Sequence, residues 1–146
     1  MRDIKDSKSC VLRIGFDGKV HKHYRGPLAR KRFDNEVAIL RHLEKKGCPY
    51  VPRLLHVDAD ELYVITTNCG SRADRISEDK SSALFEELER DYGVRHLDPF
   101  PRNVTYNSRL GRFCLIDFEF ASIPGTDIGL APEEAEAAHQ EEKRNL

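Results

Sequence analysis

The segments His96-Leu97-Asp98-Pro99-Phe100-Pro101-Arg102-Asn103 and Ile116-Asp117-Phe118-Glu119 carry the most information about this chain. An aspartate stands five residues before an asparagine, and a second aspartate follows a stretch with the pattern of a short hairpin. This is the spacing that phosphoryl transfer needs. One carboxylate can orient an attacking hydroxyl, while an amide and a second carboxylate can hold the metal ions that bridge nucleotide phosphates.

The two segments resemble the catalytic core of the protein-kinase-like superfamily, whose pattern is H-R-D-x-x-x-x-N followed by D-F-G. Leu97 replaces the arginine and Glu119 replaces the glycine, whereas the spacing from Asp98 to Asn103 is kept. Asp-Phe-Glu is similar to variants in minimal or atypical members, including RIO-type and lipopolysaccharide-core sugar kinases. Because Leu97 removes the usual receptor for an activation-loop phosphate, we expect no switching by that phosphorylation.

The resemblance implies ATP and Mg²⁺ as cofactors and a role for each matched residue. Asp98 would be the catalytic carboxylate that orients the acceptor, and Asn103 and Asp117 would be the metal ligands. His96 matches a histidine that braces the loop. The implied function is ATP- and Mg-dependent phosphoryl transfer to the hydroxyl of a protein or small molecule, as in an atypical serine/threonine kinase.

Two upstream residues match further positions of the family. Lys22, in a predicted strand, resembles the V-A-I-K lysine that contacts the nucleotide phosphates, with Lys19 as a nearby competitor. Glu36, in a predicted helix, resembles the glutamate that pairs with this lysine. The connector whose backbone would meet the adenine runs over 67–70 and includes Thr67, Asn68 and Cys69.

The hydrophobic pattern predicts an α+β fold. The expected elements are strands over 10–14 and 19–24, a helix opened by Pro27 and closed by Gly47, strands over 51–57 and 62–67, a helix from a Ser77 cap to about Tyr92, and strands over 104–106 and 113–116. This order matches a minimal kinase-like fold in a single domain, 1–146. An antiparallel sheet with one helix forms the small lobe (about 10–67), a truncated helical large lobe follows (71–123), and an acidic tail ends the chain (124–146).

Two features depart from the family. No G-x-G-x-x-G precedes Lys22, and Gly15 and Gly18 read as a hairpin turn, so we expect a shortened lid and weak ATP affinity. Only 27 residues follow Glu119, so the large helical subdomain is expected to be missing. Ala131-Pro132-Glu133 copies the A-P-E motif without that context. A protein partner could replace the missing subdomain.

Composition points to one ordinary globular domain, with 34% charged residues and a formal net charge of −1. The chain has no apolar stretch of membrane-spanning length and no signal-peptide pattern, so we expect a cytoplasmic protein. Its four cysteines form no C-x-x-C pair, which favours reduced thiols over a zinc site.

Other functions stay open. A pseudokinase that binds nucleotide or a partner without catalysis would explain the missing glycine lid and subdomain. The basic segment 19–32 could instead bind RNA or phosphate. His21 and His23 share a strand face at a spacing that could bind a metal ion, but a surface pair without a third ligand is the better interpretation.

Overall fold

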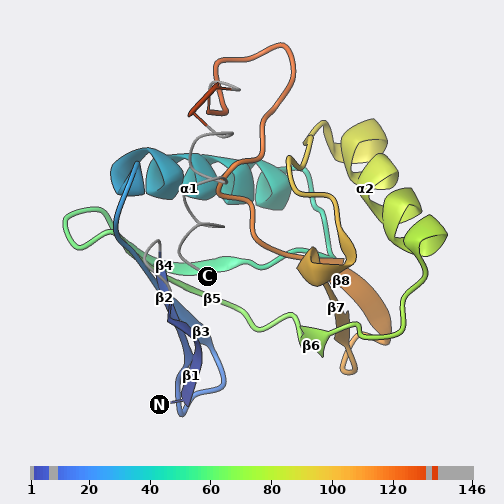
Figure 1. Cartoon of the computed structure of the whole chain (residues 1–146), viewed down its shortest axis with the longest axis horizontal. Coiled ribbons are helices and arrows are strands. Elements are labelled where there is room, and N and C mark those ends of the chain that lie inside the picture. The colour runs from blue at the N-terminus through green and yellow to red at the C-terminus, as the bar shows by residue number, and fades with distance from the viewer. Residues whose placement is uncertain (1, 7–9, 131–132, 135–146) are drawn as a thin grey trace.

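The computed structural model describes residues 2–6, 10–130 and 133–134, and it has a mixed α+β architecture built on antiparallel sheets (Figure 1). The elements are β1 (Arg2–Asp6), β2 (Cys10–Ile14), β3 (Val20–Tyr24), α1 (Ala29–Lys45), β4 (Leu54–Asp58), β5 (Tyr63–Thr66), β6 (Ser71–Arg72), α2 (Glu78–Tyr92), a 3₁₀ turn (Pro101–Asn103), β7 (Val104–Asn107) and β8 (Arg112–Leu115). The predicted α+β class is confirmed.

The larger sheet has the order β1-β2-β3-β5-β4, with antiparallel neighbours throughout. Lys22 lies in its middle strand, between Leu12 of β2 and Val64 of β5. Helix α1 packs on β3 and β4, and Phe33 and Val37 bury the apolar side of the helix against this sheet. The polar end of Lys22 therefore emerges from a buried strand towards a helix.

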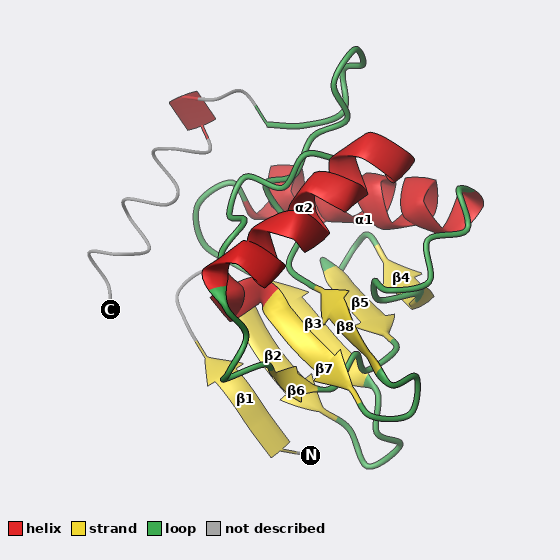
Figure 2. Ribbon diagram, turned by 90° about the vertical axis from the view of Figure 1, so that its right-hand side faces the viewer, coloured by secondary structure: helices red, strands yellow, loops and turns green. Residues whose placement is uncertain are grey.

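The second sheet, β6-β7-β8, shares the main hydrophobic core with both helices (Figure 2). Leu43 of α1, Leu88 of α2 and Leu115 of β8 are fully buried in that core. The Ser77 side chain accepts a bond from the Lys80 amide, and Gly93 closes α2 with φ of 73°, so the predicted caps are confirmed. Burial of α2 in the core holds the loop that follows it.

Several predicted boundaries were wrong. Helix α1 begins at Ala29 and not at Pro27, because Gly26 and Leu28 both have positive φ and turn the chain before the helix starts. Strand β4 begins at Leu54 rather than residue 51, since Val51 is buried in the core. Strand β6 was not predicted. Its two residues pair with β7, and a segment of two residues is too short to show the alternating pattern that predicts a strand.

Strand β1 was not predicted either. The turn around Gly18 joins β2 to β3, whereas the link between β1 and β2, residues 7–9, lies outside the described residues. Ala131, Pro132 and most of the predicted acidic tail likewise lie outside them. Within the described ranges, no helix is both long enough and apolar enough to cross a bilayer.

Candidate active site

Lys22 is buried and surrounded by carboxylates. Its Nζ lies 2.9 Å from Glu36 Oε1, 3.1 Å from Glu119 Oε1 and 3.6 Å from Asp117 Oδ1. Burial alone would lower the pKa of Lys22, but the charges of Glu119 and Glu36 outweigh it and raise the pKa well above its ordinary value. Lys22 is therefore a permanent buried cation, and its expected pairing with Glu36 is confirmed.

Glu36 joins three parts of the chain. One oxygen accepts bonds from Lys22 and from the Tyr24 hydroxyl, and the other accepts the backbone N–H of Phe118 at 2.8 Å. The N–H bond ties α1 directly to the segment that carries Asp117. A helix glutamate that bonds both a lysine and a backbone amide can hold two functional groups in fixed relation.

Glu119 and Arg32 form a second buried pair in this site, at 3.3 Å, which the sequence analysis did not assign. Burial raises the pKa of Glu119 to about 7, against the lowering effect of Lys22 and Arg32. The available signal was helical spacing, because Arg32 stands four residues before Glu36 and so lies on the same side of α1. Glu119 was noted only as the replacement of a glycine.

Asn35 adds a neutral clamp between α1 and the same segment. Its Nδ2 donates to the carbonyl oxygens of Glu119 and Ala121, each at 2.8 Å. Arg32, Asn35 and Glu36 thus occupy one turn of helix and all reach residues 118–121. The Asp117 segment is held by α1 through an ion pair, an amide and a carboxylate.

Asp98 lies in a tightly bonded loop. Arg102 approaches it with two guanidinium nitrogens, one of them at 2.8 Å, and Asn103 Nδ2 donates to Asp98 Oδ2 at 2.7 Å. The Asp98 amide donates to His96 Nδ1, while His96 Nε2 lies 2.9 Å from the Ile116 carbonyl. These partners fix the loop that was predicted to carry catalysis.

His96 has the bracing position that the resemblance implied. Burial lowers its pKa, with opposing contributions from Asp117 and Asp98, so the ring is neutral near pH 7. The Ile116 amide donates to the Asn103 carbonyl at 3.0 Å, which joins the Asp98–Asn103 loop to the Asp117 segment. The two motif segments therefore adjoin. The convergence of Asp98, Asn103 and Asp117 on one metal site stays a prediction.

Asp117 has a left-handed backbone, with φ of 68°, and about a third of its side chain is exposed. A non-glycine residue in this conformation carries strain that its neighbours must hold in place. Phe118, fully buried beside it, supplies part of that restraint through its core packing and its bond to Glu36. The carboxylate of Asp117 therefore lies at the partly exposed edge of the cluster around Lys22.

The donor set fits Mg²⁺ in part. Asp117 offers carboxylate oxygens, and Asn103 offers an amide oxygen because its Nδ2 is committed to Asp98. Among the described residues, no group of three or more His, Cys, Asp and Glu side chains is arranged to hold a metal ion. In the predicted site, Asn103 and Asp117 would supply two oxygen-bearing side chains, and further ligands would have to come from phosphate and water.

The connector is bonded to several neighbours. Thr67 exchanges bonds with the Arg53 backbone, Asn68 Nδ2 donates to the Gly18 carbonyl at 3.2 Å, and the Cys69 carbonyl accepts the Thr105 hydroxyl at 2.7 Å. The expected adenine contact through this backbone stays a prediction. These bonds reduce the number of connector groups that could meet a base.

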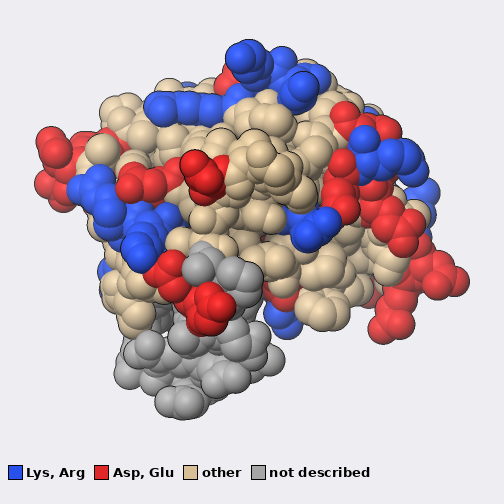
Figure 3. Space-filling view, turned by 90° about the horizontal axis from the view of Figure 1, so that it is seen from above, with Lys and Arg blue, Asp and Glu red and all other residues tan. Residues whose placement is uncertain are grey.

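The basic segment 19–32 does not form a uniform phosphate-binding face. Lys22 and Arg32 point inward to carboxylates, Arg30 lies 3.9 Å from Asp34, and Lys31 contacts Glu134. On the face shown in Figure 3, basic and acidic side chains are interspersed. His21 and His23 each pack on the Tyr63 ring rather than facing a common ligand.

Comparison with known proteins adds no family assignment, because no protein-family model and no curated protein matches the chain.

Proposed function

We propose that this chain is a kinase-like phosphotransferase that uses ATP and Mg²⁺ to phosphorylate a hydroxyl acceptor. The observation that carries the proposal is the position of Lys22, whose Nζ contacts both Glu36 and Asp117. These three residues come from a strand, a helix and a distant loop, and the resemblance had selected each of them separately. Their meeting in one buried cluster supports the kinase-like interpretation of the fold.

In this proposal, Lys22 neutralises the nucleotide phosphates and Glu36 keeps its ammonium in place. Asp98 accepts a hydrogen bond from the hydroxyl of the acceptor. The bonds of Asp98 to Arg102 and Asn103 fix the orientation of its carboxylate. When bound, Mg²⁺ would be held by Asn103 and Asp117 and would neutralise charge on the phosphates.

The test is Mg·ATP-dependent phosphoryl transfer at millimolar ATP, read as autophosphorylation and as ATP turnover. We expect Asp117→Asn to abolish both, because it removes a charge at the metal position. Asp98→Asn should slow transfer by about a hundredfold or more while the ATP-induced rise in melting temperature remains. Asp60→Asn, an exposed aspartate distant in sequence from both motif segments, is the matched control and should behave like the unmutated protein.

Glu119 favours a second candidate, a pseudokinase that binds nucleotide or a partner without catalysis. Its carboxylate lies 3.1 Å from Lys22 Nζ, where it competes with a phosphate for the same cation. An ATP-induced rise in melting temperature without phosphate transfer would select this candidate. If the unmutated protein neither binds nor turns over ATP at millimolar concentration, phosphotransfer is excluded.

A further inference from the structure

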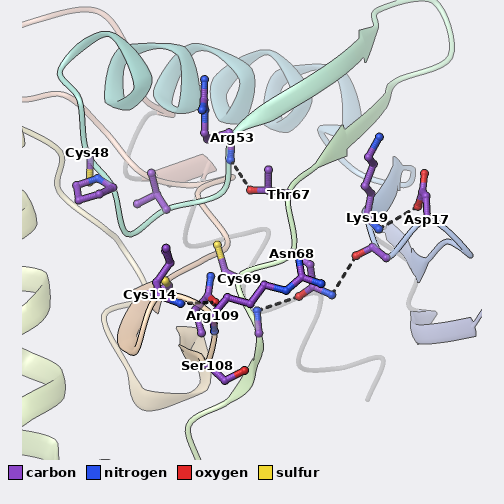
Figure 4. Close-up of a pocket in the computed structure, with 16 residues that line it drawn as sticks. Asp17, Lys19, Cys48, Arg53, Thr67, Asn68, Cys69, Ser108, Arg109 and Cys114 are labelled. Carbon is purple, nitrogen blue, oxygen red and sulfur yellow. Dashed lines mark hydrogen bonds between the residues drawn. The ribbon is translucent and has the colours of Figure 1, made fainter.

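A pocket of about 630 Å³ opens at the connector (Figure 4), and Lys22 is not among the residues that line it. Its walls come from four segments: the β2–β3 turn, the stretch between α1 and β4, the connector after β5, and the β7–β8 turn. A volume of this size is typical of small-molecule sites. A ligand there would contact segments from both sheets at once.

The pocket is distinct from the proposed catalytic and metal residues, but the connector residues Thr67, Asn68 and Cys69 belong to its lining. Lys22, Asp98, Asn103 and Asp117 are all absent from its lining. The bond from Asn68 to the Gly18 carbonyl closes the connector against the β2–β3 turn, so the pocket has a fixed polar edge. An occupant would share the connector with the predicted adenine contact, but none of the residues assigned to the phosphates, the metal or the acceptor.

Cations dominate the charged groups of this pocket. Lys19, Arg53 and Arg109 line it, against the carboxylate of Asp17. Arg53 is paired with Glu44 outside the lining, whereas neither Lys19 nor Arg109, both exposed, has a carboxylate within ion-pair distance in the described part of the chain. Asp17 accepts the Lys19 backbone N–H and faces His21. The pocket thus presents surplus positive charge to an entering molecule.

The opposite wall is apolar. In Figure 4, Cys48, Cys69 and Cys114 lie on the side of the pocket away from Lys19, and Val51 also belongs to the lining. Cys114 is the cross-strand neighbour of Thr105, whose hydroxyl bonds the Cys69 carbonyl, so the two thiols adjoin on one face of the hairpin. Buried thiols behave as small hydrophobic groups.

We propose that this pocket binds a small organic anion whose apolar body packs on the cysteine wall and whose charged group meets Lys19 and Arg109. Each half of the ligand matches one half of the pocket. An apolar group buries surface against the wall, and an anion is attracted by two exposed cations that have no carboxylate within ion-pair distance in the described part of the chain. A purely apolar ligand would leave the cations unused, and a simple inorganic anion would leave the apolar wall uncovered.

A single-tryptophan reporter tests the proposal directly, because the chain contains no tryptophan. Leu110→Trp places the indole at the pocket, where the native leucine is exposed. The probes are 4-tert-butylbenzenesulfonate, its neutral sulfonamide, and inorganic sulfate. We expect saturable binding of the sulfonate in the range of about 0.1 to 1 mM, and binding of the sulfonamide and of sulfate about tenfold weaker or less.

The second part of the test is charge reversal. Binding is measured by fluorescence in the Leu110→Trp background and by saturation-transfer NMR on protein with native Leu110. Arg109→Glu and Lys19→Glu should each weaken sulfonate binding at least about fivefold, while Arg41→Glu, on the exposed side of α1, should change it less than about twofold. Absence of saturable binding in the NMR experiment, equal binding of the sulfonamide or of sulfate, or an effect of Arg41→Glu as large as that of Arg109→Glu would each overturn the proposal.

Discussion

Replacing Arg32 with methionine tests whether the buried ion cluster is a structural unit. Arg32 is almost completely buried, and its guanidinium contacts Glu119 Oε1 at 3.3 Å. It also donates to the carbonyl oxygens of Pro27 and Arg25 just before α1. Methionine fills much of the same volume but supplies none of these bonds, so Glu119 loses one of its two cations.

The expected loss of unfolding free energy is about 3 to 5 kcal/mol, the usual effect of removing one partner from a buried ion pair. The two lost bonds to carbonyl oxygens contribute part of it, at about 1 kcal/mol or more each. A domain of this size is stable by only about 5 to 15 kcal/mol, so the variant should be severely destabilised. Adding Glu119→Gln should restore about 1 to 3 kcal/mol, because the unpaired carboxylate is removed while the lost carbonyl bonds are not replaced.

The assay is urea unfolding followed by circular dichroism for the two single variants and the double variant. Arg30→Met is the matched control, since Arg30 lies on the same helix and faces Asp34 with both side chains exposed. This control should change stability by no more than about 0.5 kcal/mol. The reasoning fails if Arg32→Met is as mild as Arg30→Met, or if Glu119→Gln adds to the damage instead of relieving it.

Two further predictions concern pH and backbone geometry. Burial raises the pKa of Glu119 from 4.5 to about 7, so the folded chain binds more protons than the unfolded chain between these values. The unfolding free energy of the unmutated protein, measured relative to that of Glu119→Gln, should therefore fall by on the order of 3 kcal/mol from pH 4.5 to pH 7.5. The assay is urea titration of both proteins at each pH. A difference that does not change with pH would contradict this prediction. Gly70→Ala should destabilise by more than about 3 kcal/mol, since its Cβ would lie 2.0 Å from the Tyr106 carbonyl oxygen, whereas Gly18→Ala, with positive φ but open space, should cost about 1 to 2 kcal/mol in the same assay. Equal effects of the two glycine substitutions would contradict the clash.

Regular elements with a strong local signal were predictable. Helix α2 carries its own start and stop signals in Ser77 and Gly93, and the hairpin of β2 and β3 is marked by Asp17-Gly18. These signals act within a few residues, so sequence alone contains them. Strand β6 has no such signal, because its two residues are extended only through pairing with β7.

The residues of the candidate site also fall into those that a sequence pattern could select and those that it could not. Lys22, Glu36 and Asp117 could be selected because their spacing resembles a known motif. Asn35 and Tyr24 could not, since each joins the site only through a contact across 12 to 86 positions of the chain, and Arg32 was indicated only by its helical spacing from Glu36. Whether Glu119 faces solvent or Lys22 depends on how α1 packs, and no local pattern encodes that.

Helix α1 links the stability of the core to the geometry of the candidate site. One helical turn presents Arg32, Asn35 and Glu36 to the segment that follows Asp117, where Asn35 and Glu36 bond the backbone and Arg32 bonds the side chain of Glu119. The left-handed conformation of Asp117 is costly in isolation, by about 1 to 3 kcal/mol, and persists because these contacts over-determine it. A cluster that served stability alone would need neither a strained aspartate nor a lysine shared among three carboxylates, and replacing buried charges with apolar groups is often neutral or stabilising. The presence of this arrangement inside the core supports the proposal made above, in which Lys22 and Asp117 are held in position for a ligand that carries charge of its own.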